Sequence, residues 1–345
     1  MYCAEWLFVI ERYLEILQFM KDRFMQNAQN IIEYARELSV NQLFKANGFN
    51  TVWDIWKSEI KNKYLSDIPT EHQIHELGDH LRDIFRTTGQ AGRSQSDVSG
   101  GGANWEALVC WYLNLCLIGR RTFVIKHHNS LIPDPVKKAI TVNYGSFPSN
   151  TESDLIAITF PNKEDYTIDK DLICVNDVNQ NEVRTRAGSS YNFLQVLSAL
   201  VSRDFPEVEI HIIQCKTNWN DNAQIPMLWD AVYSANNFRN GIHVGSDGYS
   251  IHDAARFSYS FVTVPSNQLE KGGNEQYKPT STAVLRVKNL SGGNYWGTSS
   301  KAGVASSVKE LVERNLKSGH AQGILSTIKQ ALPDLGTTYS YFKLF

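Results

Sequence analysis

The sequence predicts an α/β protein with an additional helical region at its N-terminal end. Apolar residues recur at helical spacing through roughly the first 90 residues. Further along, short runs of β-branched residues alternate with helical segments, and the clearest run occupies residues 208–213, just after Pro206. We therefore divide the 345 residues into a helical accessory or dimerisation region, residues 1–95, and an α/β domain, residues 96–345.

The composition is that of an ordinary globular protein. Hydrophobic residues make up 42% of the chain and charged residues 20%, with a formal net charge of -2. This near-neutral charge excludes a basic field over the whole protein, so any nucleic acid must bind a local patch. The five cysteines are scattered, with no CxxC pair, which predicts reduced thiols and a cytoplasmic protein.

The N-terminal region is expected to contain four helices, over residues 6–20, 31–38, 53–64 and 72–85. Charged residues interrupt the apolar first helix, so we expect no membrane span there. We interpret the region as structural, not catalytic. Three histidines on the fourth helix are expected to be solvated: His72, His75 and His80.

The strand at residues 208–216 ends in the polar residues Gln214 and Lys216. These two side chains project to one face because they are two positions apart, while Cys215 points to the other face. A lysine at the end of a buried strand must reach water or serve a purpose there. Lys216 is therefore the first candidate functional residue.

Glu106 is a second candidate. The Gly- and Ser-rich residues 87–103 predict a loop, followed by a helix with Asn104 as its N-cap. Glu106 shares its helical face with Cys110 and two leucines, so its carboxylate would need a metal or a lysine as partner. Alternatively, Glu106 lies in the first turn, favours the helix dipole and faces solvent.

Asp154 is the third candidate, because it stands where a turn enters an apolar strand at residues 155–160. The alternative is an ordinary turn aspartate. Residues 161–207 do not continue the sheet directly and are interpreted as an insertion with a short strand at 171–175 and a helix near 191–201. After Lys216, a helix capped by Asp221 or Asn222 is expected.

This order of elements resembles the core of the PD-(D/E)xK nucleases, and the whole resembles a type II restriction endonuclease. The residues that carry the resemblance are Glu106 on a helix, Asp154 opening a strand, and Gln214 and Lys216 closing one. Ser153 stands where the family motif has proline, and 62 positions separate Asp154 from Lys216 because of the insertion. The resemblance implies a mixed central sheet flanked by helices, with the nuclease domain at residues 96–345.

The resemblance also implies a Mg²⁺ site. Mg²⁺ prefers oxygen ligands and keeps several waters, one of which can attack phosphorus. Asp154 would be the essential ligand. Glu106 would bind the ion directly or through a water molecule, and either the Gln214 side-chain oxygen or the Cys215 carbonyl oxygen would be a further ligand. Lys216 would orient and help deprotonate the water.

Candidate DNA contacts fall into three groups. Basic residues near a short strand could clamp phosphates, although a solvated surface is the commoner fate: Arg120, Arg121 and Lys126. Amides just past the lysine suit adenine edges, with capping and turn chemistry as the alternative: Asn218, Asn220 and Gln224. The third group lies in a Gly-rich loop at 290–301 and consists of Asn294, Tyr295 and Lys301. The alternative is that this loop is an ordinary connection.

The sequence thus predicts a Mg²⁺-dependent type II restriction endonuclease that cuts double-stranded DNA at a specific short sequence. A homodimer is expected because two sites related by a two-fold axis suit a palindrome. One alternative is a structure-specific repair or junction nuclease. The other is a non-catalytic DNA-binding protein in which Glu106, Asp154 and Lys216 form a structural ion-pair network.

Overall fold

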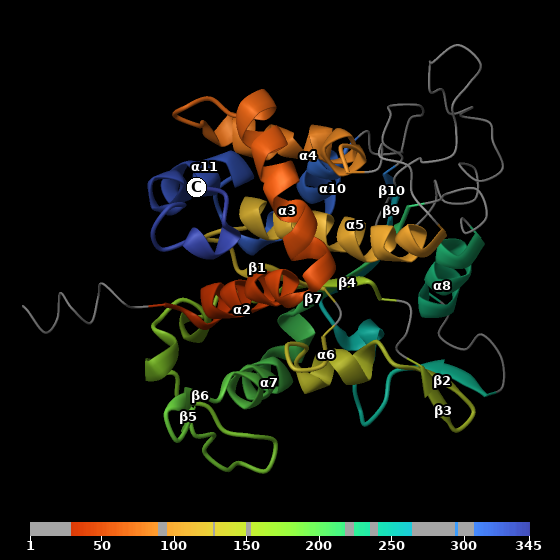
Figure 1. The fold of residues 1–345 in the computed structure, drawn as a ribbon. Helices are drawn as coiled ribbons and strands as arrows, with labels where there is room; N and C mark the ends of the chain where they lie inside the picture. Colours follow the sequence, from red (N-terminus) through yellow and green to blue (C-terminus); the bar gives the residue numbers. More distant parts are fainter. Residues whose placement is uncertain are drawn as a thin grey trace, which may run out of the picture.

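A five-stranded mixed sheet organises the chain (Figure 1). The computed structural model describes residues 29–88, 95–126, 128–149, 153–217, 224–234, 241–263, 294–295 and 307–345. In spatial order the strands are β1 (Thr122–Lys126), β4 (Leu155–Thr159), β7 (Glu209–Lys216), β9 (Arg256–Thr263) and β10 (Asn294–Tyr295). The expected mixed central sheet flanked by helices is therefore confirmed.

The strand directions follow from the connections. β1, β4 and β7 pair antiparallel, whereas β9 runs parallel to β7 and is reached through helix α8 (Gln224–Ser234). β10 pairs parallel with β9 on the side of β9 that faces away from β7. Helix α5 (Gln95–Cys116) precedes β1. The core order is thus a helix, three antiparallel strands, a helix and a parallel strand.

Each face of the sheet is covered by its own apolar core. Successive residues of a strand face opposite sides, so Ile213 and Cys215 join the first core, under α5, while Ile210 and Ile212 join the second. The first core also takes in α3 (Asn47–Glu59), α4 (Glu71–Arg86), α10 (Val308–Asn315) and α11 (Ile324–Ala331). The second contains α6 (Asp134–Ala139) and α7 (Phe193–Asp204). Burial of each aliphatic side chain contributes about 1.5–3 kcal/mol.

The predicted helices of the N-terminal region are confirmed where the structure describes them. Helix α2 (Ile31–Lys45), α3 with its π-helical extension η1 (Ile60–Tyr64), and α4 cover the expected positions, while the helix expected at residues 6–20 lies outside the described residues. Packing is continuous across residue 95, since the rings of Trp53 of α3 and Trp111 of α5 pack in a tilted arrangement with centroids 4.8 Å apart. The expected solvation of His75 is wrong, because this side chain is buried.

Residues 161–207 form the expected insertion between the paired strands β4 and β7. It contains η2 (Glu164–Tyr166), η3 (Lys170–Leu172), a hairpin of β5 (Arg186–Ala187) and β6 (Ser190–Tyr191), α7, and η4 (Phe205–Glu207). The helix expected near 191–201 is confirmed as α7. The strand expected at 171–175 is wrong: Asp169 caps a 3-10 turn through the Asp171 N–H, and the chain continues without a strand partner.

A second, three-stranded sheet projects beside the first. It consists of β3 (Phe147–Ser149), β2 (Val142–Tyr144) and β8 (Ile242–Val244), in that spatial order. The remaining short helices are η5 (Ile251–Asp253), η6 (Lys317–Gly319), η7 (Leu332–Asp334) and η8 (Ser340–Phe342). Within the described ranges, no helix has the length and apolar character needed to cross a membrane.

Candidate functional site

Helix α5 begins earlier than the sequence indicated, and this changes the position of Glu106. The Gly-rich residues from Gln95 onward, expected in a loop, are already helical. Asn104 therefore lies inside the helix and is not its N-cap. Glycine costs about 1 kcal/mol in a helix interior, but the following segment buries Trp105, Leu108 and their neighbours, which outweighs that cost. Glu106 lies eleven residues inside the helix, beyond the reach of the first-turn dipole effect.

Asp154 and Lys216 meet at one end of the sheet. Antiparallel pairing of Leu155 with Ile213 sets Asp154 beside the end of β7. The Cys215 N–H donates to Asp154 Oδ2 at 2.7 Å, and Lys216 Nζ lies 3.7 Å from the same oxygen. The side chains of Asp154 and Lys216 are 17% and 27% exposed, so solvent reaches both.

Glu106 faces the same end of the sheet. Its Oε2 lies 3.3 Å from Lys126 Nζ, and that ammonium also donates to the Ala103 carbonyl at 2.8 Å. Burial raises the pKa of Glu106, and the negative charge of Asp154 adds to the rise, while Lys126 and Lys216 oppose it. The three predicted residues therefore lie within electrostatic range of one another, joined by Lys126.

Gln214 is arranged differently from the expectation. It is fully buried, and its Oε1 accepts a hydrogen bond of 2.7 Å from the Tyr259 hydroxyl. The side-chain oxygen is thus engaged within the second core. Burial, with the charges of Asp154 and Glu106, holds the pKa of the Cys215 thiol well above its usual value. The Cys215 thiol stays protonated, so the backbone carbonyl of Cys215 is the ligand we favour from this strand.

Arg120 is not a DNA contact, which corrects the interpretation of the basic residues. Its guanidinium is 2% exposed and donates to the Gln322 carbonyl at 2.8 Å and to the Lys317 carbonyl. Burial lowers the pKa of Arg120 to about 10. Sequence proximity to a strand could not reveal that the C-terminal segment folds over this side chain and takes its donors.

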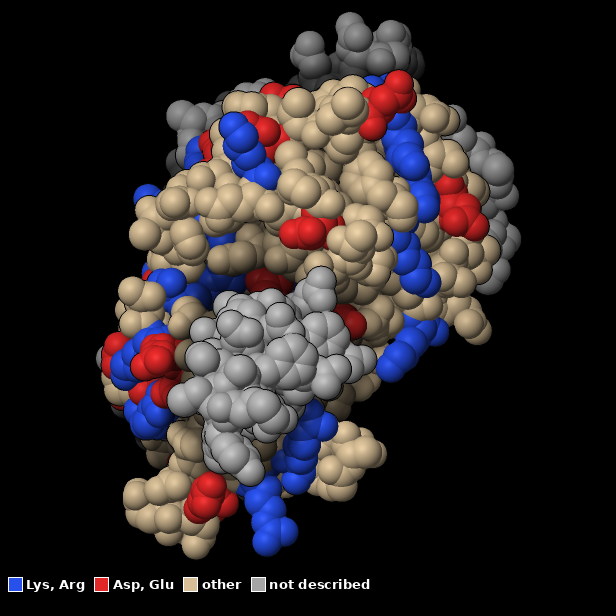
Figure 2. All heavy atoms as spheres, turned by 90° about the vertical axis from the view of Figure 1, so that its left-hand side faces the viewer, with Lys and Arg blue, Asp and Glu red and all other residues tan. Residues whose placement is uncertain are grey.

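The other two basic candidates lie at opposite ends of β1. Arg121 donates from Nε to the Phe160 carbonyl at 3.3 Å, at the end where the strand begins. Lys126 closes the strand beside Glu106 and Asp154. The three residues thus do not form one basic patch. On the face shown in Figure 2, basic and acidic side chains are interspersed.

The remaining DNA-contact candidates are only partly described. Asn218, Asn220 and Lys301 lie outside the described residues, and Gln224 is described only as the first backbone residue of α8. The backbones of Asn294 and Tyr295 form β10, where they pair with Phe261 and Val262 of β9. Those two β9 residues pair in turn with Gln214 and Cys215. Residues 294–295 therefore join the sheet at the level of the candidate site.

The donor set fits Mg²⁺. Within the described part of the chain, no three His, Cys, Asp or Glu side chains group together as a metal cluster. The site offers the carboxylates of Glu106 and Asp154 with the Cys215 carbonyl, all hard oxygens. Mg²⁺ commonly takes one or two carboxylates and completes its shell with water and substrate phosphate. A metal that demands a full protein cage, or sulfur, would not suit this set.

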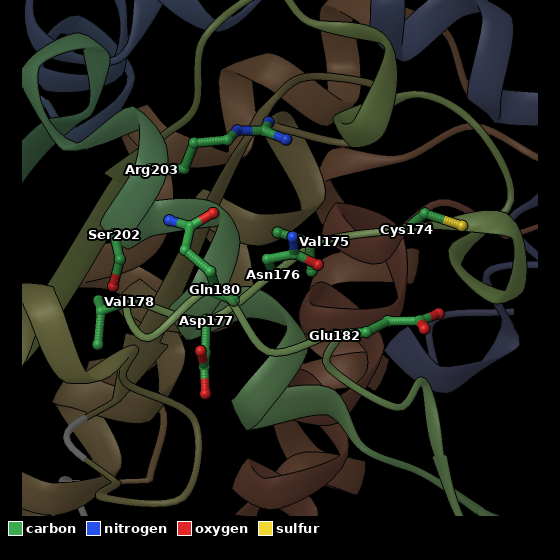
Figure 3. Close-up of a pocket in the computed structure, with 10 residues that line it drawn as sticks. Cys174, Val175, Asn176, Asp177, Val178, Gln180, Glu182, Ser202 and Arg203 are labelled. Carbon is green, nitrogen blue, oxygen red and sulfur yellow. The ribbon is translucent and has the colours of Figure 1, made fainter.

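Two adjoining clefts lie away from this site, along α7. Their volumes are about 580 and 790 Å³, and both are lined by Asp177, Val178 and Ser202. Figure 3 shows the first, where the turn carrying Asp177 and Gln180 lies beside Ser202 and Arg203 of the helix. Asp177 accepts from the backbone N–H groups of its own turn. Sequence reasoning gave no signal for these clefts, and they hold none of the candidate residues.

The sequence matches no protein-family model and no curated protein.

Proposed function

We propose that this protein is a Mg²⁺-dependent endonuclease of the PD-(D/E)xK type that hydrolyses phosphodiester bonds in double-stranded DNA. The observation that carries the proposal is the meeting of Asp154 and Lys216, 3.7 Å apart at an open strand end, with the carboxylate of Glu106 in range of both. The fold supports it, since the resemblance implies a mixed central sheet flanked by helices, with Glu106 on a helix and Asp154 and Lys216 at strand ends.

The residues would divide the work as follows. Asp154 and Glu106 would hold Mg²⁺ with the Cys215 carbonyl, and the bound ion would supply charge neutralisation on the phosphate and an acidified water. The Cys215 N–H fixes Oδ2 of Asp154. Lys216 Nζ would donate a hydrogen bond to the attacking water and stabilise the negative charge that develops at phosphorus.

Lys126 would hold Glu106 in place. Its ammonium ties the carboxylate to the Ala103 carbonyl of the same helix. Burial raises the pKa of Glu106 and the charge of Lys126 lowers it, so the ammonium favours the ionised carboxylate. This role differs from the phosphate clamp expected from the sequence.

We further propose site-specific cleavage by a homodimer, as in type II restriction, in the cytoplasm. A palindromic duplex offers two equivalent phosphates, and a two-fold symmetric dimer would present two copies of the site. A junction-specific nuclease would use the same residues on branched substrates, so comparison of branched with linear duplexes separates the two functions.

The direct test is digestion of a sequenced closed circular plasmid by the full chain, with Mg²⁺ or with EDTA. We expect discrete fragments with Mg²⁺ and intact plasmid with EDTA. Asp154→Asn and Lys216→Ala should each lower the cleavage rate by at least about 100-fold, since each removes a group acting on the reacting phosphate.

Lys309→Ala is the matched control. Lys309 also pairs with an aspartate, Asp79, and its side chain is 26% exposed, close to the 27% of Lys216. It should cleave like the unaltered chain. If Lys216→Ala instead cleaves normally, or unfolds while Lys309→Ala does not, Lys216 is structural and the ion-pair alternative holds.

A further inference from the structure

The hairpin of β2 and β3 carries two exposed aromatic side chains at its tip. Tyr144 and Phe147 are cross-strand partners, so their side chains share one face of the hairpin. Tyr144 is 39% exposed and Phe147 66% exposed, and the adjoining Pro148 is exposed as well. A scattered exposed apolar residue needs no explanation, but an exposed cluster at a projecting tip marks a contact site.

The tip is held in a fixed shape. Gly145 adopts φ +61, the left-handed conformation that a tight two-residue hairpin turn requires at its first position. Its N–H donates to the Gly241 carbonyl at 2.5 Å, and Asn143 Nδ2 donates to the Gly245 carbonyl at 2.8 Å. These bonds join the hairpin to β8. The aromatic pair is therefore ordered before any partner binds, which lowers the entropy cost of binding.

The hairpin is tethered to the candidate site. β3 ends at Ser149, and Asp154 follows five residues later. Five residues span at most about 18 Å when fully extended. Figure 1 shows the hairpin on the same side of the molecule as α8 and the first turns of α5, which carries Glu106. A long rigid ligand with one phosphate at Asp154 would pass within reach of the tip.

The charge around the hairpin suits a polyanion. Residues 135–149 contain Lys137 and Lys138 and no acidic residue, and residues 241–246 contain none either. Asp134 directly precedes the first segment and Asp247 directly follows the second, and Asp247 is paired with Lys138 at 3.3 Å. No carboxylate of these two segments would repel a phosphate backbone lying against the hairpin.

We propose that the hairpin tip binds duplex DNA and inserts Phe147, backed by Tyr144 and Pro148, as an apolar wedge between base pairs. This inference rests on the proposed function, because the duplex it contacts is the one cut at Asp154. Phenylalanine and proline are side chains that unstack base steps in this way, and the resulting kink brings more protein surface onto the DNA. The wedge would bend the duplex near the scissile phosphate.

A second copy of the chain is the competing occupant of this face, and the structure favours it less. β2 and β3 are three residues long each, and a stable dimer buries about 1,600 Å² in total. A pair of three-residue strands offers a small part of that area. A side chain inserted into a base step needs no such area.

The test uses full chains that carry Lys216→Ala, which keeps the proposed metal ligands but removes cleavage, so that the plasmid stays closed with Mg²⁺ present. In this background we compare Tyr144→Ala/Phe147→Ala with Leu172→Ala, a control whose exposure of 61% matches the 66% of Phe147. A relaxing topoisomerase reports unwinding of the plasmid as a change in linking number. Gel retardation of fragments of the same plasmid reports affinity.

We expect the background and Leu172→Ala to change the linking number, and the double variant to lose this change and bind at least tenfold more weakly. If the double variant unwinds and binds DNA as the background does, the wedge is overturned. Plasmid digestion by the unaltered chain would be unaffected by that result, so the proposed function would stand. A changed protomer number in sedimentation with unchanged DNA affinity would also overturn the wedge, in favour of a second copy. Absence of DNA binding together with absence of plasmid digestion would overturn both proposals.

Discussion

The substitution Lys126→Met removes the cation beside Glu106 and should destabilise the protein in a pH-dependent way. Lys126 Nζ lies 3.3 Å from Glu106 Oε2, and both side chains are partly exposed, at 27% and 22%. Coulomb's law at the dielectric of water gives roughly 1.3 kcal/mol at this distance, and measured exposed pairs give about 0.2–1 kcal/mol. We expect about 0.5–1 kcal/mol from the charge pair at pH 7.

The pH dependence follows from the raised pKa of Glu106. At a pH below the ordinary glutamate pKa of 4.5, the carboxyl is protonated in both the folded and the unfolded chain. The Lys126–Glu106 pair then contributes nothing to the free energy of unfolding. As pH rises, the unfolded chain loses its proton first, so ionisation of Glu106 costs folding free energy until the pH passes the folded pKa. Lys126 offsets that cost only at high pH, where Glu106 is charged.

The assay is urea unfolding of the unaltered chain, Lys126→Met, Glu106→Gln and the double variant at pH 7 and at pH 4. The coupling free energy between the two residues should be about 0.5–1 kcal/mol at pH 7 and smaller at pH 4. Glu106→Gln alone should be neutral or stabilising at pH 7, because it removes a partly buried charge. Equal coupling at the two pH values, or a Glu106→Gln variant as destabilised as Lys126→Met, would refute the reasoning.

Three further outcomes are expected. Arg120→Met should lower the free energy of unfolding by about 1.5–3 kcal/mol, since it leaves the part-buried Gln322 and Lys317 carbonyls without their charged donor, and the folded fraction should retain its DNA affinity in a gel retardation assay. Burial lowers the pKa of His75 to about 4, so the unfolded chain takes up a proton first as pH falls below about 6.5. Stability should therefore drop between pH 6.5 and 4, by at most about 3 kcal/mol, and His75→Gln should flatten this part of the denaturation profile. Mg²⁺ at ten times its dissociation constant should raise the melting temperature by about 2 °C, and Asp154→Asn should abolish this shift in a thermal melt.

The sequence by itself determined the elements that repeat a local pattern. Helical spacing indicated α2, α3 and α4, and the β-branched run indicated β7 with Lys216 at its end. A lysine after a buried strand and an aspartate before another are unusual enough to single out Lys216 and Asp154. Periodicity is a property of neighbouring residues, so one chain segment suffices to show it.

Only the tertiary structure decided which groups these residues meet. Lys126 and Arg120 were expected to have the same role, yet Lys126 pairs with Glu106 while Arg120 is buried under carbonyls of the C-terminal segment about 200 residues away. The sequence left open whether the Gln214 oxygen is a ligand, and the hydroxyl of Tyr259 takes that oxygen. Partners of a charged or amide group depend on strand register and on which distant segment covers it, and neither is encoded in the local pattern.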